Sequence, residues 1–320
     1  MPLPQDEKLV ETSKAIIGEF KGIFGPHPGF RPAHAKGALV TGIFTPSSVA
    51  STLSSAPHFV SQSTPIIARF SSSTGIPGLP DTDSNGNPRG LAIRFQLPSL
   101  PSIPDRRQHT DIITHAVDGF PASTPEETLA FFSSVRAGTV GEFLATHPKA
   151  LTFIQTPKPF PKSFATEKFF SVSAFKLVSS EGKGTFVRYR IVPATGNPKG
   201  EYLTDEEVKG KGDEYLFDEL RSIDKETGSI EYKLLAQVAD LEKGDVTDDN
   251  TAKWPETREI VELGTISLTE ALGKEESDEM QKGFIFDPIP RVEGVEASDD
   301  PLLELRAGIY LISGRERRAA

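Results

Sequence analysis

The chain has 320 residues, of which 37% are hydrophobic and 25% are charged, a composition typical of a globular protein. It contains no cysteine, which excludes disulfides, thiolate nucleophiles and thiolate-ligated metals. Its 35 Lys and Arg against 45 Asp and Glu give a net charge of −10, so we expect no nucleic-acid partner. No apolar run could span a membrane and the N-terminus lacks the core of a signal peptide, which favours a cytoplasmic location.

The first third of the chain predicts one helix and then several strands. Residues 5–24 place apolar side chains at a period near 3.6, which predicts an amphipathic helix that ends at Gly25 and acts as a lid or an arm. Short runs rich in β-branched residues and Phe follow, separated by Pro, Gly, Ser and Asn, at 37–45, 65–73, 90–97 and 110–117. This pattern is typical of an antiparallel sheet or barrel.

The remaining elements mix helices and strands. Capping boxes at 124–127 and 204–207 predict two helices, the first running to about Arg136 and the second lying between the last two of three further strand-like runs. These runs are 168–178, 184–192 and 229–239. We expect loops at 240–256 and 272–301, and a helix with a basic last turn at 302–318. Since no repeat, linker or change in composition divides the chain, it is predicted to be one α+β domain built on a β-barrel.

Several familiar motifs are incomplete or missing. Asp81, Asp83, Asn85 and Gly86 copy the first half of an EF-hand loop, but Ala92 stands where a glutamate should close the calcium site, so we predict a turn. The sequence contains no phosphate-binding glycine loop, no GxSxG elbow and no HExxH. Hydrolase and nucleotide-binding functions therefore lose their usual support.

Two places in the sequence could carry chemistry. His34 is flanked by small residues where a strand should begin, which leaves room for a flat ligand beside the imidazole, and His115 lies in another strand-like run. Arg306 and Tyr310 stand four apart on the last predicted helix, so their side chains can meet. Spacing alone favours a packing or cation–π pair. The alternative is a tyrosine kept ionised by the guanidinium, which would be a hard anionic ligand for ferric iron.

An ordered set of segments resembles the haem catalases. The set runs in the family's order through most of the chain: RPAHAKG at 31–37, ARFS at 68–71, NPRGLAIRF at 87–95, KWP at 253–255, ELGT at 262–265, FDP at 286–288, GVE at 294–296 and Arg306-x-x-x-Tyr310. The chain is well below the length of ordinary catalases, so the closest resemblance is to the small catalase-related peroxidases. The resemblance implies an antiparallel β-barrel of the haem-catalase type with flanking helices.

The resemblance also implies how one haem-binding domain, residues 1–320, would be arranged. It would have an N-terminal helix at 1–25, a barrel with inserted helices at 31–270, and a helix at 300–318 that holds haem b through Tyr310. Tyr310 would be the axial ligand of the haem iron, and Arg306 would keep it ionised. His34 would be the distal general acid/base, oriented by Ser71. The other expected cofactor contacts are the propionate-neutralising Arg31, Arg69 and Arg317, and the aromatic Phe120.

One departure from the family bears on the activity. The distal asparagine that helps to hold peroxide in catalases falls on His115 here, and a family phenylalanine further along falls on Thr128. A neutral imidazole offers one donor and one acceptor and titrates near pH 6.5, unlike an amide. We therefore expect His115 to act at the distal site. We expect the protein to have weak catalase activity at most and better peroxidase activity.

The function that this resemblance implies is a haem peroxidase reducing hydrogen peroxide or organic hydroperoxides with a small organic reductant. The alternatives are a fatty-acid hydroperoxide-converting enzyme of the allene oxide synthase type, since 21 phenylalanines could line an apolar channel, and a true catalase. A barrel that carries a small apolar ligand, with His34 and Tyr310 as ordinary packed residues, belongs to a different class. Because the chain lacks the long arm of tetrameric catalases, a monomer or homodimer is expected.

Overall fold

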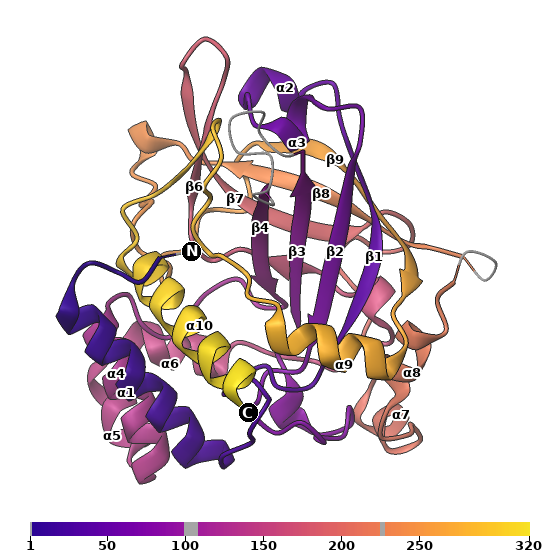
Figure 1. Ribbon diagram of the computed structural model, residues 1–320. Coiled ribbons are helices and arrows are strands. Elements are labelled where there is room, and N and C mark those ends of the chain that lie inside the picture. The colour runs from indigo at the N-terminus through magenta and orange to yellow at the C-terminus, as the bar shows by residue number, and fades with distance from the viewer. Residues whose placement is uncertain (1, 99–107, 225–227) are drawn as a thin grey trace.

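The computed structural model describes residues 2–98, 108–224 and 228–320, and within these residues an antiparallel β-barrel dominates (Figure 1). Eight strands form the ring in the order β7-β5-β4-β3-β2-β1-β9-β8, and pairing between β7 and β8 closes it. The ring strands are β1 (Gly37–Pro46), β2 (Thr64–Ser71), β3 (Gly90–Leu97), β4 (Gln108–His115), β5 (Phe169–Phe170), β7 (Gly184–Pro193), β8 (Ile230–Val238) and β9 (Ile260–Ala271). Outside the ring, β6 (Phe175–Val178) pairs with β7, and β10 (Val295–Ala297) pairs with β6.

Helices cover the barrel in separate groups. Figure 1 shows α1, α4, α5 and α6 gathered beside α10 on one side of the barrel, while α7 and α8 lie on another. The longer helices are α1 (Glu7–Phe24), α4 (Pro125–Ala137), α9 (Lys274–Gly283) and α10 (Pro301–Ala319). The shorter ones are α2 (Ala50–Leu53), α3 (Pro57–Val60), α5 (Val140–Thr146), α6 (Pro148–Gln155), α7 (Asp205–Lys209) and α8 (Tyr215–Arg221).

Aromatic side chains fill much of the core. Phe44 of β1 and Phe95 of β3 meet at right angles with ring centroids 5.2 Å apart, and Phe70 of β2 lies 4.7 Å from Phe164. Edge-to-face and tilted contacts of this kind are favourable because the edge of one ring meets the face of the next. The phenylalanine-rich strand runs are therefore explained largely by packing.

The structure confirms most of the predicted elements. The N-terminal helix, the first four strands, the two capped helices and the C-terminal helix all form, and the partial EF-hand is a short 3₁₀ turn at Ser84–Gly86. Thr124 caps α4 by accepting from the amide of Glu127, but the Glu127 carboxylate accepts from Ser123 instead of Thr124. Thr204 and Glu207 form the complete reciprocal box at α7.

Two expectations are corrected. The run 168–178 is not one strand but two, β5 and β6, that pair with β7 at different places. The expected loop 272–301 contains α9 and β10. Helix α9 has the sequence KEESDEMQKG and buries the polar Ser277 and Gln281, so no apolar stripe announces it.

Close packing of two helices fixes the position of α10. A side chain at Gly308 would place its Cβ 2.5 Å from Ser13 Oγ of α1, so the glycine is needed for this approach. Ser13 Oγ donates to the carbonyl of Leu9 and lies 3.4 Å from that of Leu305. Asp300 begins α10 by accepting from the amide of Leu302. None of the helices in the described ranges is long and apolar enough to cross a membrane.

His58 generates a prediction about acid stability. Its side chain is 1% exposed and packs against Phe59 and Phe95, and burial lowers its pKa to about 3. In the unfolded chain the pKa is about 6.5, so the stabilising effect of neutral His58 is complete above that pH and is lost as the pH falls towards 3. As the pH falls, we expect the free energy of unfolding of His58→Phe to decrease less steeply than that of wild type, by at most about 1.4 kcal/mol per pH unit. Urea titrations between pH 7 and 4 measure these free energies. The same dependence on pH in both proteins would contradict the prediction.

Candidate active site

The register of three neighbouring strands brings two of the predicted distal residues, Ser71 and His115, to either side of Gly90. Ser71 of β2 lies opposite Gly90 of β3, and Gly90 lies opposite His115 of β4. A Cβ at Gly90 would come within 2.6 Å of Ser71 Oγ and 3.0 Å of His34 Nδ1. Glycine at this point therefore makes the space that the His34 imidazole occupies.

His34 is held in an unusual backbone conformation. Its φ of +56° is the one positive value at a non-glycine residue in the described parts of the chain. Its amide donates to the carbonyl of Ser73 at 3.2 Å, and its own carbonyl accepts from Arg69 Nη2 at 2.8 Å. Nδ1 lies 3.0 Å from Ser71 Oγ, which leaves Nε2 as the nitrogen able to exchange a proton. Ser71 is thus the hydrogen-bond partner of the ring at Nδ1.

The two cavity histidines are neutral at neutral pH. Burial, aided by the nearby charge of Arg69, lowers the pKa of His34 to about 3. Burial and then the charge of Arg306 lower the pKa of His115 to about 4. Each ring therefore carries a lone pair under ordinary conditions. The buried Nε2 of His115 has no hydrogen-bond partner among the described residues.

The predicted site residues line one cavity of about 670 Å³, within the range of cofactor pockets. His34, Ser71 and His115 contribute from the barrel side, and Arg306 and Tyr310 from α10. The remaining predicted residues, Arg31, Arg69, Phe120 and Arg317, also line it. Aromatic side chains from α1, α4 and α6 complete much of the wall, namely Phe20, Phe24, Phe131, Phe132 and Phe153.

Phe120 and Thr128 share this wall. The Phe120 ring lies 6.3 Å from that of Phe153. Thr128 Oγ1 donates to the carbonyl of Thr124, so its hydroxyl is engaged with its own helix. The cavity thus has an aromatic contact at Phe120 and a smaller side chain at Thr128.

Arg306 and Tyr310 meet as their spacing predicted. Arg306 Nη2 lies 3.5 Å from Tyr310 Oη, and the guanidinium carbon lies 5.8 Å from the ring centroid. Arg306 Nη1 lies 3.4 Å from Ser173 Oγ. The pKa of buried Asp300 is raised by its burial, while Ser173 and the charge of Arg306 oppose that shift. Arg306 therefore lies near Ser173 as well as Tyr310, and its charge also acts on the carboxyl group of Asp300.

Three arginines concentrate positive charge at the cavity without a matching carboxylate. Arg31, Arg69 and Arg317 donate to carbonyl, amide or hydroxyl oxygens, and none forms an ion pair with a described carboxylate. Burial first, and then Arg69 and Arg317, lower the pKa of Arg31 well below its ordinary value. Burial and Arg317 lower the pKa of Arg69 to about 9, and burial lowers that of Arg317 to about 10.

These residues fit a haem. Its two propionates would supply the negative charge that the arginine cluster lacks, which is a geometry that guanidinium groups recognise well. Tyr310, which lines the same cavity as His34 and His115, would offer a phenol oxygen to the iron. The aromatic wall suits the flat apolar macrocycle.

Sequence reasoning missed the support behind this cavity. Asp300 could have been noticed, since an Asp before Pro301 at a helix start is a common N-cap signal. Nothing in the sequence indicates that Ser173 reaches Arg306 or that Gly90 must be small, because both depend on contacts between distant segments.

Comparisons with known proteins agree with this geometry. The catalase family model matches residues 29–98 and 127–320, and leaves out the segment that holds His115 and Phe120. The chain is 31% identical to a catalase-related peroxidase of Mycolicibacterium paratuberculosis, with 96% of this chain and 95% of the relative covered. It is 30% identical to a catalase-related peroxidase of Synechococcus elongatus, with 96% and 88% covered.

Solved structures support the fold. Catalase A from Saccharomyces cerevisiae superposes with a TM-score of 0.77 at 20% identity, covering 99% of this chain and 65% of the yeast protein. A fungal catalase gives a TM-score of 0.76 at 20% identity and covers 99% of this chain and 63% of that one. The chain thus spans just under two thirds of these larger proteins. With the family match over most of its length and the two relatives of nearly equal size, the chain belongs to the catalase family.

Proposed function

We propose that this protein is a haem b peroxidase that reduces hydrogen peroxide or an organic hydroperoxide with a small organic reductant. One observation carries the proposal: His34 and Tyr310 line the same cavity, together with three arginines that form no ion pair with a described carboxylate. The two curated relatives named catalase-related peroxidases support it.

In this proposal α10 and β2 supply the groups that hold the haem. Tyr310 would hold the iron through its phenol oxygen, and Arg306, whose Nη2 lies 3.5 Å from that oxygen, would stabilise its ionised form. Arg31, Arg69 and Arg317 pair with the propionates, and Phe120 contacts the macrocycle. The bound haem supplies the electrons that reduce the peroxide.

His34 moves the proton. Its neutral Nε2 would take the proton from one peroxide oxygen and return it to the other, which leaves as water or as an alcohol. Ser71 keeps Nδ1 occupied, so the ring stays in the orientation and tautomer that this transfer needs. Two electrons and two protons from the reductant complete the turnover, so ROOH and AH₂ give ROH, H₂O and A.

His115 favours peroxidation over dismutation. Dismutation requires a second peroxide to be positioned as the reductant, and an imidazole presents fewer hydrogen-bonding groups than a carboxamide. The aromatic wall suits an organic hydroperoxide or reductant, but no separate observation favours the hydroperoxide-rearranging or carrier alternatives. We further propose one domain over residues 1–320, with parts at 1–25, 31–270 and 300–318, acting as a monomer or homodimer.

The cofactor is tested by absorption spectroscopy. Purified protein loaded with haem is expected to show a high-spin Soret band that changes on adding hydrogen peroxide, and Tyr310→Phe is expected to lose the tyrosinate spectrum because the iron loses its axial oxygen. Tyr202→Phe, which removes a phenol outside the cavity, serves as the control. Protein that takes up no haem would overturn the proposed function.

The role of His34 is tested by substitution. His34→Ala should keep its haem but cleave peroxide about 10²–10⁴-fold more slowly, because a positioned acid/base usually contributes that much. Stopped-flow rates with hydrogen peroxide measure the loss. His147→Ala, at a histidine stacked on Phe143 away from the cavity, should change little. An undiminished rate in His34→Ala would remove this residue from the mechanism.

The distal departure is tested by restoring an amide. We expect His115→Asn to raise oxygen release relative to reductant oxidation, since the amide can hold a second peroxide. The ratio is measured with an oxygen electrode and a phenolic donor in parallel. His109→Asn on the same strand is the matched control. An unchanged ratio would show that the imidazole is not what limits dismutation.

A further inference from the structure

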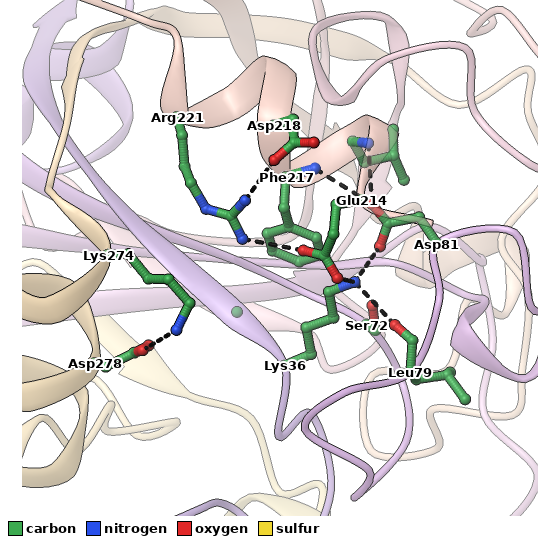
Figure 2. A network of polar contacts seen from close by, with 12 residues as sticks. Lys36, Ser72, Leu79, Asp81, Glu214, Phe217, Asp218, Arg221, Lys274 and Asp278 are labelled. Carbon is green, nitrogen blue, oxygen red and sulfur yellow. Dashed lines mark hydrogen bonds and ion pairs between the residues drawn. The ribbon is translucent and has the colours of Figure 1, made fainter. Parts of the chain in front are cut away.

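A buried polar network lies beside the cavity and does not belong to it (Figure 2). Lys36 is 7% exposed, and its Nζ donates to the carbonyl of Leu79 at 2.8 Å, to Asp81 Oδ1 at 2.8 Å and to Glu214 Oε1 at 2.7 Å. The ammonium also lies 4.9 Å from the centroid of the Phe217 ring. All three donor positions of this lysine are therefore used inside the protein.

Asp81 is the centre of the network. Its Oδ2 accepts from the amides of Leu216 and Phe217 in α8, at 3.0 and 3.3 Å. Its carbonyl accepts from Arg89 Nη2 at 2.6 Å, and Arg89 Nη1 donates to Ser72 Oγ at 2.6 Å. Asp81 and Arg89 are fully buried, so these bonds are shielded from water.

The network and the distal site are built on the same three segments. Ser72 directly follows Ser71, Arg89 directly precedes Gly90, and Lys36 lies two residues after His34. Ser72 and Arg89 directly adjoin the ends of β2 and β3, and Lys36 directly precedes Gly37, the first residue of β1, so groups held at these three positions restrain the chain that leads to Ser71, Gly90 and His34. The contacts that restrain Lys36, Ser72 and Arg89 therefore also restrain Ser71 and Gly90, which lie against the His34 imidazole.

The segment that carries His34 needs such restraint. A histidine at φ +56° is in a region that side chains disfavour, so the surrounding structure must impose it. The carbonyl of Lys36 accepts from the amide of Ser72 at 3.1 Å, and Ala35 donates to Thr74 at 2.9 Å. These backbone bonds fix the path of the segment, and the Lys36 side chain ties its end to Asp81 and α8.

We propose that Lys36, acting through Asp81, is a positioning residue for His34 in peroxide cleavage. The inference rests on the proposed function. A buried ion pair adds little net stability compared with apolar packing, whereas it can select one conformation. The conformation selected here places Nδ1 against Ser71 and frees Nε2.

The test compares Lys36→Met with wild type, both loaded with haem. We expect kcat for peroxide cleavage to fall at least tenfold while KM for the reductant stays within twofold. Potassium cyanide provides a spectroscopic readout, because a correctly placed distal base assists its binding, and its Kd should rise at least tenfold. Lys233→Met, which removes an exposed ion pair with Glu262 on the barrel surface, is the matched control.

Folded Lys36→Met with wild-type kcat and cyanide affinity would overturn the proposal, even if its melting temperature were lower. If Lys36→Met does not fold, Glu214→Gln carries the same test, since Glu214 is a half-exposed partner of the same ammonium. We expect it to weaken cyanide binding about threefold, and no change would overturn the proposal.

Failure of the proposed function is distinguished by a readout that needs no cofactor. In haem-free protein labelled with ¹³C-histidine, the imidazole signal of His34 should shift in Lys36→Met and not in Lys233→Met. If the signal shifts in Lys36→Met but haem-loaded wild type does not cleave peroxide, the positioning role is supported and the proposed function fails. If the signal does not shift and wild type cleaves peroxide at full rate, the positioning role fails and the proposed function stands.

Discussion

Unpaired positive charge is the constraint around which this molecule is organised. Arg31, Arg69 and Arg317 come from three distant parts of the chain and meet at one cavity, where burial and mutual repulsion disfavour their charged forms. A dianionic ligand removes that repulsion, so it stabilises the folded chain by mass action as well as by contact. Arg69 extends the effect, because the same guanidinium holds the carbonyl of His34. Under the proposed function, cofactor binding and the geometry of the distal base would thus share one side chain.

Much of the fold could be predicted because its signals are local. The strand runs of β1 to β4 are apolar and bounded by turn residues, and α1 and α10 show helical periods. Several elements were not predicted, including the ring strand β9, and two of these misses have a clear physical reason. Helix α9 buries polar groups, which mimics a loop, and β5 and β6 adjoin in sequence yet separate because each pairs with a different part of β7. Tertiary contacts decide both cases.

In the candidate site, too, some contacts follow from local sequence and others depend on distant segments. Arg306 and Tyr310 lie one helical turn apart, so their meeting follows from local geometry. The convergence of His34 and Ser71 depends on strand register, and only the family resemblance placed them together beforehand. The Lys36 network had no signal at all, since its partners lie 45 and 178 residues away. The family model does not match the segment that holds His115, so the role of this histidine stays a prediction.

The position of Tyr310 in the last helix has a consequence for biosynthesis. Synthesis runs from the N-terminus, so His34 and Arg69 leave the ribosome early, whereas α10 emerges after every strand of the barrel. The nascent barrel therefore presents His34 and part of the arginine cluster before Tyr310 has been made. Under the proposed function, the cofactor would be fully held only once α10 has docked against α1 through Gly308 and Ser13. A chain truncated before α10 would keep the sequence of every ring strand and lose the proposed iron ligand.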